Sequence, residues 1–188
     1  MVEMTHGTLA TPTRPAPLLF VIPAYNEEAN IERLFADLES HTEITGAAAR
    51  IVIVDDGSAD ATPRLVEQYG GELPIELLRF ERNQGPGAAF RAGFESVLAD
   101  APDDALVVTM EADTTGDLDA LPRMLARACS DADVVLADWR MQNVAAHRKL
   151  LSAAAGYVVR KMLGLDAKTV SSFFRVYRAS VLQGAFGR

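Results

Sequence analysis

The sequence contains a single cysteine, Cys129, among 188 residues, so the chain can form no internal disulfide. A chain without disulfides is typical of a reducing compartment, and we expect a cytoplasmic location. We also expect Cys129 to be buried as a small apolar side chain. No apolar run approaches the ~20 residues that a membrane-spanning helix needs. Residues 1–17 lack an apolar core and contain three prolines, which predicts a flexible leader and not a signal peptide.

Basic residues are scarce in most of the chain and concentrated in its last quarter. Residues 1–139 hold nine Arg and no Lys against 25 acidic residues, a net charge of −16. Residues 140–188 hold nine basic residues against one acid, Asp166, a net charge of +8, and the whole chain carries −8. This asymmetry predicts that the basic segment meets an anionic group, although a solvated helix face would have the same composition.

Short apolar segments alternate with segments of helical periodicity along the chain. The predicted strands are Leu18–Ile22, Ile51–Val54, Ile75–Phe80, Leu106–Met110 and Val134–Ala137. Three of the predicted helices are Glu27–Leu38, Gly87–Leu98 and Leu118–Ala128. A further helix is predicted to be capped by Ser58 or Asp60 and to end at Tyr69. Solidly apolar strands between helices indicate a single α/β domain, in which helices cover both faces of a parallel sheet.

Polar and acidic residues follow every predicted strand. They are Pro23–Glu27, Asp55–Ser58, Asn83–Gly87, Glu111–Asp113 and Asp138–Arg140. In open parallel sheets, ligands bind beyond the carboxyl ends of the strands. Five such loops at one edge of the sheet therefore predict a ligand site.

Two pairs of carboxylates stand out among these loops. Glu111 and Asp113 flank one residue, and in an extended segment such side chains point the same way, so both can face one ion. Oxygen ligands of this kind suit Mg²⁺ or Mn²⁺ shared with substrate phosphates, but turn residues before a helix would have the same pattern. Asp55 and Asp56 repel each other and need a cation, a base or a sugar hydroxyl as partner, or serve in an Asx turn and a helix cap.

The glycine-rich loop Asn83–Gly93 differs from a phosphate-binding loop. It contains neither Gly-Lys-Ser/Thr nor the spacing G-x-G-x-x-G at Gly85. We expect its glycines to permit close packing of the backbone. A nucleotidyltransferase would carry its glycine-rich loop directly after the first strand, where this chain has Pro23. A signalling receiver domain, the other rival with paired acids, would need a Lys-Pro that is absent here.

Taken together, these segments resemble family 2 glycosyltransferases of the GT-A fold, and within them the dolichol-phosphate and polyprenyl-phosphate mannose or glucose synthases. The matching segments are Val21–Glu28, Val52–Ser58 with Thr62, Asn83–Gly93 and Glu111–Asp113. The resemblance runs from Leu18 to Leu182 and implies a Rossmann-like, mostly parallel sheet flanked by helices. It also implies a nucleotide-sugar-binding core over residues 18–140 and a basic acceptor-side segment over residues 141–188, for which truncation is an open alternative.

The resemblance assigns roles to residues on the donor side. Its substrate-binding residues there are Pro23, Tyr25, Glu27, Asp55 and Asp56, with Asp55 receiving donors from the base. Asp113, together with Glu111, would hold Mg²⁺ or Mn²⁺ on the diphosphate. The family usually has Asp where Glu111 stands and often has Gln where Thr115 stands.

On the acceptor side the resemblance assigns the phosphate groups to Arg140, Arg148, Ser152 and Arg175. Asp113, Arg140 and Arg175 are the expected catalytic residues. The family often has Gly at the position of Phe173.

A phosphate acceptor also agrees with the charges. A hydroxyl acceptor needs a general base, and Asp166 is the one acid in the basic segment, whereas an ionised phosphate needs only cationic clamps. We therefore expect inverting transfer from a donor of the GDP-mannose or UDP-glucose type to a polyprenyl or dolichyl phosphate, with no nucleic-acid partner. Transfer to a sugar hydroxyl and a truncated non-catalytic binding domain are the alternatives. The basic amphipathic segment 144–163 either packs on the domain or lies on the cytoplasmic face of a membrane.

Overall fold

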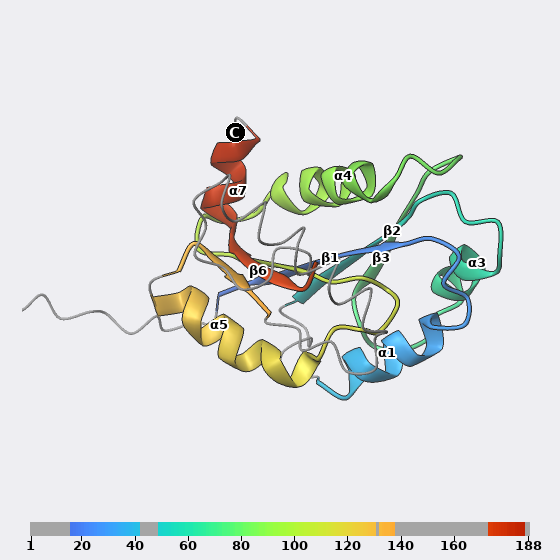
Figure 1. Ribbon diagram of the computed structural model, residues 1–188, viewed down its shortest axis with the longest axis horizontal. Coiled ribbons are helices and arrows are strands. Elements are labelled where there is room, and N and C mark those ends of the chain that lie inside the picture. Colours follow the sequence, from blue (N-terminus) through green and yellow to red (C-terminus); the bar gives the residue numbers. More distant parts are fainter. Residues whose placement is uncertain (1–15, 42–48, 131, 138–172, 187–188) are drawn as a thin grey trace, which may run out of the picture.

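The computed structural model describes residues 16–41, 49–130, 132–137 and 173–186 (Figure 1). The strands are β1 (Leu18–Ala24), β2 (Ala49–Asp55), β3 (Ile75–Arg79), β4 (Leu106–Thr109), β5 (Val134–Leu136) and β6 (Arg175–Arg178). The helices are α1 (Ile31–Glu39), α3 (Thr62–Glu67), α4 (Pro86–Leu98), α5 (Leu121–Ser130) and α7 (Ala179–Ala185), with a 3-10 turn, η1 (Leu118–Ala120), before α5.

The strands form one sheet in the order β3-β2-β1-β4-β6-β5. Strands β1 to β4 are parallel, whereas β6 runs antiparallel to both β4 and β5. The first five strands confirm the predicted ones, with ends that shift by one or two residues. The sixth was not predicted, and it separates β4 from β5. The sheet is thus mostly parallel, as the resemblance implied.

Both faces of the sheet are apolar because alternate residues of the central strands point to opposite sides. Phe20, Ile22, Ile51 and Ile53 pack against α1, α3 and α5, while Val21, Val52 and Val54 pack against α4 and α7. Figure 1 shows the two helical layers on either side of the sheet. Each fully buried aliphatic side chain contributes about 1.5–3 kcal/mol to folding, so the central strands anchor the domain.

The start of α1 and the surface of α5 differ from the sequence-based expectations. Helix α1 begins at Ile31 and not at Glu27, because residues 27–30 form a turn that is hydrogen-bonded to the loop after β2. In α5, the core-facing residues are Leu121, Met124 and Ala128. Cys129 lies outside this core-facing stripe and is exposed, so the expectation that it is buried was wrong.

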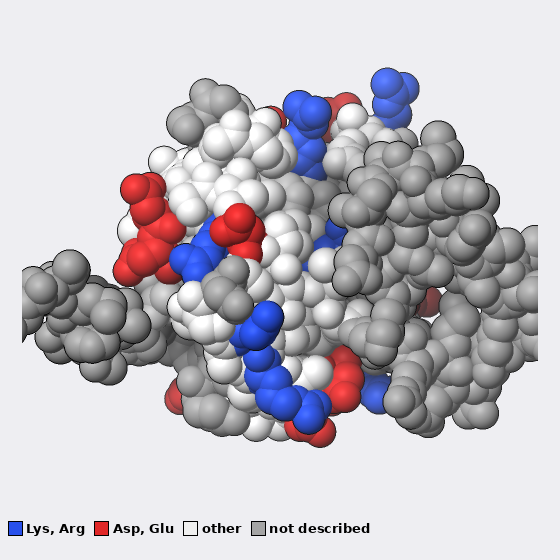
Figure 2. All heavy atoms as spheres, turned by 60° about the vertical axis from the view of Figure 1, so that its left-hand side comes forward, with Lys and Arg blue, Asp and Glu red and all other residues white. Residues whose placement is uncertain are grey.

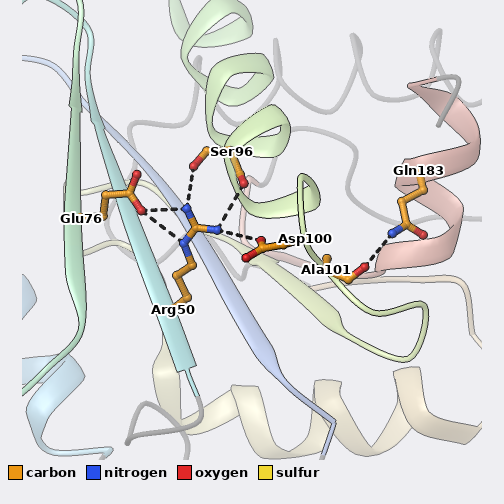
Figure 3. A network of polar contacts seen from close by, with 6 residues as sticks. All are labelled: Arg50, Glu76, Ser96, Asp100, Ala101 and Gln183. Atoms are coloured by element: carbon orange, nitrogen blue, oxygen red, sulfur yellow. Dashed lines mark hydrogen bonds and ion pairs between the residues drawn. The ribbon is translucent and has the colours of Figure 1, made fainter.

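A polar network holds the amino-terminal edge of the sheet (Figure 3). Arg50 of β2 pairs with Glu76 of β3 at 2.8 Å and with Asp100 at 3.2 Å, and it also donates to the Ser96 carbonyl and hydroxyl. A single guanidinium thus ties two strands to the end of α4. This edge is opposite to the one where the polar loops gather.

None of the helices that the structure describes is long and apolar enough to cross a membrane. On the face shown in Figure 2, the described basic and acidic side chains are interspersed with uncharged atoms. Most of the predicted basic segment, including the helix at 144–163, lies outside the described residues.

Candidate functional site

The carboxyl ends of β1 and β4 are joined beyond the last ladder residue of β4. The Met110 N–H donates to the Val21 carbonyl at 3.3 Å, and the Ala112 N–H donates to the Pro23 carbonyl at 3.2 Å. The Ala112 side chain is buried in the core, while Glu111 and Asp113 on either side of it are half-buried. Ala112 and Asp113 lie in the turn that follows β4, so the two half-buried carboxylates flank the residue whose N–H is bonded to Pro23.

A third acid lies near this pair. Burial raises the pKa of Glu111 above its ordinary value of 4.5, and the negative charges of Asp113 and Glu27 raise it further. Glu27 follows β1, so residues from two strand ends share one electrostatic environment. A cation at this point would relieve the repulsion that the three carboxylates exert on one another.

These oxygens fit a divalent cation that is shared with a substrate. No three His, Cys, Asp or Glu side chains within the described part of the chain are arranged to hold a metal ion by themselves. Mg²⁺ commonly takes only one or two carboxylates from the protein and completes its shell with water and substrate phosphates. Glu111 and Asp113 would supply those two carboxylates.

The turn after Asp113 orients its carboxylate. The Thr115 N–H and hydroxyl donate to Asp113 Oδ1 at 3.0 and 2.7 Å. Between them, Thr114 has a φ of 57°, which is unusual for a β-branched residue and marks local strain. Asp113 Oδ2 takes part in no hydrogen bond with the residues that the structure describes. Thr115 stands where the family often has Gln. It holds the Asp113 carboxylate in place through two hydrogen bonds to the same oxygen, Oδ1.

The adjacent acids Asp55 and Asp56 avoid repulsion by pointing to opposite faces of the sheet. Asp55 is fully buried, accepts a hydrogen bond from the Ser58 N–H at 3.1 Å, and lies 3.3 Å from Arg79 Nε. Asp56 is also buried, and its carboxylate accepts from the Gln84 and Gly85 N–H groups at 2.7 and 2.8 Å. Asp55 thus serves in a turn, whereas Asp56 supports the glycine-rich loop.

Two backbone N–H groups of the glycine-rich loop before α4 are already hydrogen-bonded to a side chain of the protein. The Asp56 carboxylate accepts hydrogen bonds from N–H groups that could otherwise bind an anion. A carboxylate near the N-terminus of a helix is also favoured by the helix dipole. Farther along α4, a Cβ on Gly93 would overlap the Val21 side chain. Both observations support the expected role of these residues in close packing.

A set of reciprocal hydrogen bonds connects the loop after β1 to the loop after β2. Three successive N–H groups, of Asn26, Glu27 and Glu28, donate to side-chain oxygens of Ser58, Thr62 and Asp60 at 2.9, 2.8 and 3.1 Å. In return, the Asn26 and Glu28 side chains accept from the Ala59 and Ala61 N–H groups, each at 2.9 Å. We call this set the loop clip.

The loop clip holds the segment in which the family resemblance places residues for the nucleotide. Glu27 also accepts from the Asn30 side chain at 2.6 Å, and Tyr25 beside it is 46% exposed. Burial raises the pKa of Asp60, but hydrogen bonds from Thr62 and Glu28 outweigh this effect and hold the pKa below its ordinary value. The sequence pointed to Thr62 through the family resemblance, to Ser58 through that resemblance and as a helix cap, and to Asp60 as a helix cap.

On the other side of β4, the strand β6 brings Arg175 to the same edge. Arg175 is paired in register with Thr109, the last residue of β4, and its guanidinium donates to the Tyr177 hydroxyl at 3.3 Å. Phe173, where the family often has Gly, stacks on Phe90 of α4 with ring centres 5.1 Å apart. Its carbonyl accepts from the Thr109 hydroxyl at 2.6 Å, so the segment that leads into β6 is held at the strand end.

The structure therefore places Pro23, Tyr25, Glu27, Asp55, Asp56, Glu111, Asp113 and Arg175 at the carboxyl ends of β1, β2, β4 and at the adjoining start of β6. Three of the predicted site residues, Arg140, Arg148 and Ser152, lie outside the described residues. Arg79, which contacts Asp55, was not singled out in the sequence because nothing but its place at a strand end marks it.

Comparison with known proteins gives the same fold and a family. The sequence profile of glycosyl transferase family 2 matches residues 19–186. The undecaprenyl-phosphate 4-deoxy-4-formamido-L-arabinose transferase of Pseudomonas paraeruginosa is 32% identical over 165 residues, which cover 87% of this chain and 47% of that protein. The chain spans about half the length of the curated relatives it matches.

Two solved structures share the architecture at low sequence identity. The mannosyltransferase PcManGT from Pyrobaculum calidifontis, in complex with GDP-Man and Mn²⁺, superposes with a TM-score of 0.64 at 19% identity, covering 94% of this chain and 48% of that one. The glucosyl-3-phosphoglycerate synthase of Mycobacterium tuberculosis, in complex with Mn²⁺, UDP and glucosyl-3-phosphoglycerate, gives 0.65 at 19% identity, covering 89% and 58%. These structures show the GT-A fold, and the profile match over residues 19–186 shows that the chain belongs to glycosyl transferase family 2.

Proposed function

We propose that this chain binds a nucleotide-sugar and transfers its sugar to a polyprenyl phosphate with inversion at the anomeric carbon. The name of the Pseudomonas relative, an undecaprenyl-phosphate sugar transferase, supports this acceptor class. The donor is of the GDP-mannose or UDP-glucose type. Contact with a membrane surface follows from an acceptor that is anchored in a bilayer.

The observation that carries the proposal is the hydrogen bond from the Ala112 N–H to the Pro23 carbonyl. It holds Glu111 and Asp113 next to the β1 end, where Tyr25 and Glu27 stand. The residues assigned to the nucleotide and those assigned to its diphosphate thus lie at one edge. This neighbourhood is what a nucleotide-sugar, with its base at one end and its diphosphate at the other, requires.

On the donor side, Pro23, Tyr25, Glu27 and Asp55 would line the nucleotide pocket. Asp56, whose carboxylate is occupied by the Gln84 and Gly85 N–H groups, would act indirectly by shaping the loop beside that pocket. Asp113 and Glu111 would hold a divalent cation. That cation, when bound, would neutralise charge on the diphosphate.

The reaction is a single displacement. An oxygen of the acceptor phosphate attacks the anomeric carbon and forms the new glycosidic bond, while the bond between that carbon and the β-phosphate oxygen breaks. The nucleoside diphosphate leaves with the electron pair. The attacking phosphate is already ionised, so no proton must be removed. The guanidinium of Arg175, with Arg140, Arg148 and Ser152, would bring the two anions together, since arginine binds phosphates in a bidentate manner.

The test is a transfer assay with radiolabelled GDP-mannose, UDP-glucose and UDP-N-acetylglucosamine, each with undecaprenyl phosphate in detergent and with Mn²⁺ or Mg²⁺. We expect one donor to give a labelled lipid product. A labelled product with a free sugar acceptor instead of the lipid would show that the acceptor is a hydroxyl. Binding of a nucleotide without transfer to any acceptor would support a binding domain only.

A further inference from the structure

Asp55 carries an oxygen without a hydrogen-bond donor. Its Oδ1 accepts from the Ser58 N–H, but Oδ2 is the one buried side-chain oxygen or nitrogen among the described residues that has no hydrogen-bond partner. The whole residue is inaccessible to solvent. A buried, unpaired carboxylate oxygen is costly, and native structures keep few of them. Asp55 Oδ2 is therefore a position at which a donor from outside the chain would be bound favourably.

In the free chain, the neighbour of this oxygen is Arg79. The Arg79 Nε atom lies 3.3 Å from Asp55 Oδ2, close enough for an ion pair, yet its N–H is not aligned for a hydrogen bond. The two residues are paired in register at the ends of β2 and β3, so the contact is fixed by the sheet. The Arg79 side chain is 53% exposed, and it can move aside without disturbing the core.

We propose that Arg79 occupies the place of the nucleobase on Asp55 in the free chain and is displaced when the nucleotide binds. This inference rests on the proposed function, because it takes Asp55 as the acceptor for the base. Arg79 would be a specificity-determining residue that acts through competition. A ring N–H of a base such as uracil or guanine would donate to Oδ2 and make the aligned hydrogen bond that Arg79 does not make.

Competition of this kind has a defined cost for the ligand. A nucleotide must break the contact between Arg79 and Asp55 before its base can dock. The measured affinity is therefore the intrinsic affinity multiplied by the fraction of chains in which this contact is open. A base without a donor at that position does not compensate for the lost contact and leaves a buried carboxylate unpaired. Only a base that presents a ring N–H therefore displaces Arg79, and a base without one leaves the contact between Arg79 and Asp55 closed.

The experiment compares the binding of UDP and GDP to the wild-type chain and to Arg79→Met by isothermal titration calorimetry. Methionine keeps much of the apolar stem and removes the guanidinium. Arg33→Met is the matched control, because Arg33 also makes an arginine–aspartate pair, with Asp37 at 3.7 Å, but on the surface of α1. Inorganic pyrophosphate and UDP methylated at N3 are measured alongside, since the first lacks a base and the second lacks the ring N–H.

We expect Arg79→Met to bind whichever of UDP and GDP the wild type prefers about twofold to fivefold more tightly, which is the range of a partly exposed ion pair. Pyrophosphate should bind both proteins equally, Arg33→Met should behave as the wild type, and the N3-methylated UDP should gain nothing from the variant. Unchanged or weaker nucleotide binding by Arg79→Met, with pyrophosphate binding unchanged, would overturn the inference and leave the proposed function standing. If neither protein binds any nucleotide, both are wrong.

A second variant covers the case in which Arg79→Met does not fold. Arg79→Lys keeps the charge but replaces the guanidinium with a more mobile ammonium. It should bind the nucleotide between one and three times as tightly as the wild type. A several-fold weaker affinity would mean that the guanidinium contacts the nucleotide directly, which contradicts displacement.

Discussion

The backbone N–H of Glu27 donates a hydrogen bond to the hydroxyl of Thr62, 35 positions later in the chain, at 2.8 Å. Thr62 is fully buried, so in Thr62→Val the valine fits the space but leaves the Glu27 N–H without an acceptor. We expect a loss of about 1–3 kcal/mol in the free energy of unfolding, the usual cost of a buried unpaired donor. Urea denaturation measures it.

The same substitution separates positioning from general stability. Thr62→Val should raise the dissociation constant for the nucleotide, because the loop clip that holds Tyr25 and Glu27 is opened. The control is Thr109→Val, which removes another buried threonine hydrogen bond, the one to the Phe173 carbonyl. It should lose comparable stability and keep its nucleotide affinity. Equal weakening by both variants would argue against a positioning role for Thr62.

The two acids of the β4 end should differ in their importance for transfer. Asp113 is oriented by Thr115, whereas the pKa of Glu111 is raised, so Asp113 is the better-prepared anion. Asp113→Asn should lower kcat/KM by about 100-fold or more, since a metal clamp is worth several kcal/mol and each tenfold corresponds to about 1.4 kcal/mol. Glu111→Gln should cost about tenfold, or ~1.4 kcal/mol.

Asp103→Asn is the matched control for these two variants, because Asp103 is exposed in the turn before β4, at the other end of the strand. It should retain wild-type activity and the same rise in melting temperature on addition of Mn²⁺ and nucleotide. Near wild-type activity of Asp113→Asn would rule out the assignment of Asp113 to the cation.

Glu111 should make stability depend on pH. Its pKa is raised in the folded chain, so between the unfolded value near 4.5 and the folded pKa the folded state holds a proton that the unfolded state has released. Stability therefore falls as pH rises through this window. In metal-free buffer, Glu111→Gln should flatten this slope in a series of denaturation curves. An unchanged slope in the variant would assign the effect to other groups.

Two glycines of α4 should respond oppositely to alanine. At Gly93 the new Cβ would overlap Val21 in the core, and such overpacking costs about 1–3 kcal/mol. At Gly87 a Cβ meets nothing within 4 Å, and alanine should stabilise the helix by about 0.4–1 kcal/mol. Thermal unfolding of Gly93→Ala and Gly87→Ala measures both. A neutral Gly93→Ala would contradict the close approach of α4 to β1.

The sequence was sufficient for the strands that are buried on both faces. Uninterrupted apolar runs such as 18–22 and 51–54 have few alternatives to a central strand, and both are found. Strand β6 escaped prediction because Arg-Val-Tyr-Arg carries one aliphatic residue, Val176, and its stability comes from pairing with β4 and β5 and not from its own composition. Pairing between distant segments leaves no local periodicity to read.

The site was predictable as a location but not as a set of contacts. A strand end followed by polar residues marked Asp55 and Asp56, yet their hydrogen-bond partners depend on where the loop at Gln84 and the end of β3 fall in space. Arg79 was overlooked for the same reason. The loop clip could not be inferred either. Its hydrogen bonds run in both directions between the loops after β1 and β2, and they can be recognised only when the positions of both loops in space are known.

The insertion of β6 between β4 and β5 has a consequence for synthesis. Arg175 pairs with Thr109, 66 residues earlier, so the open side of β4 stays unpaired while the intervening polypeptide leaves the ribosome. An apolar strand with free hydrogen-bonding groups is prone to associate with other chains during that interval. Arg175, which we propose binds phosphate, is therefore part of the strand that covers this side of β4. A ribosome that stalls before residue 175 would release a chain that has the acids after β4 but an unpaired, aggregation-prone strand edge.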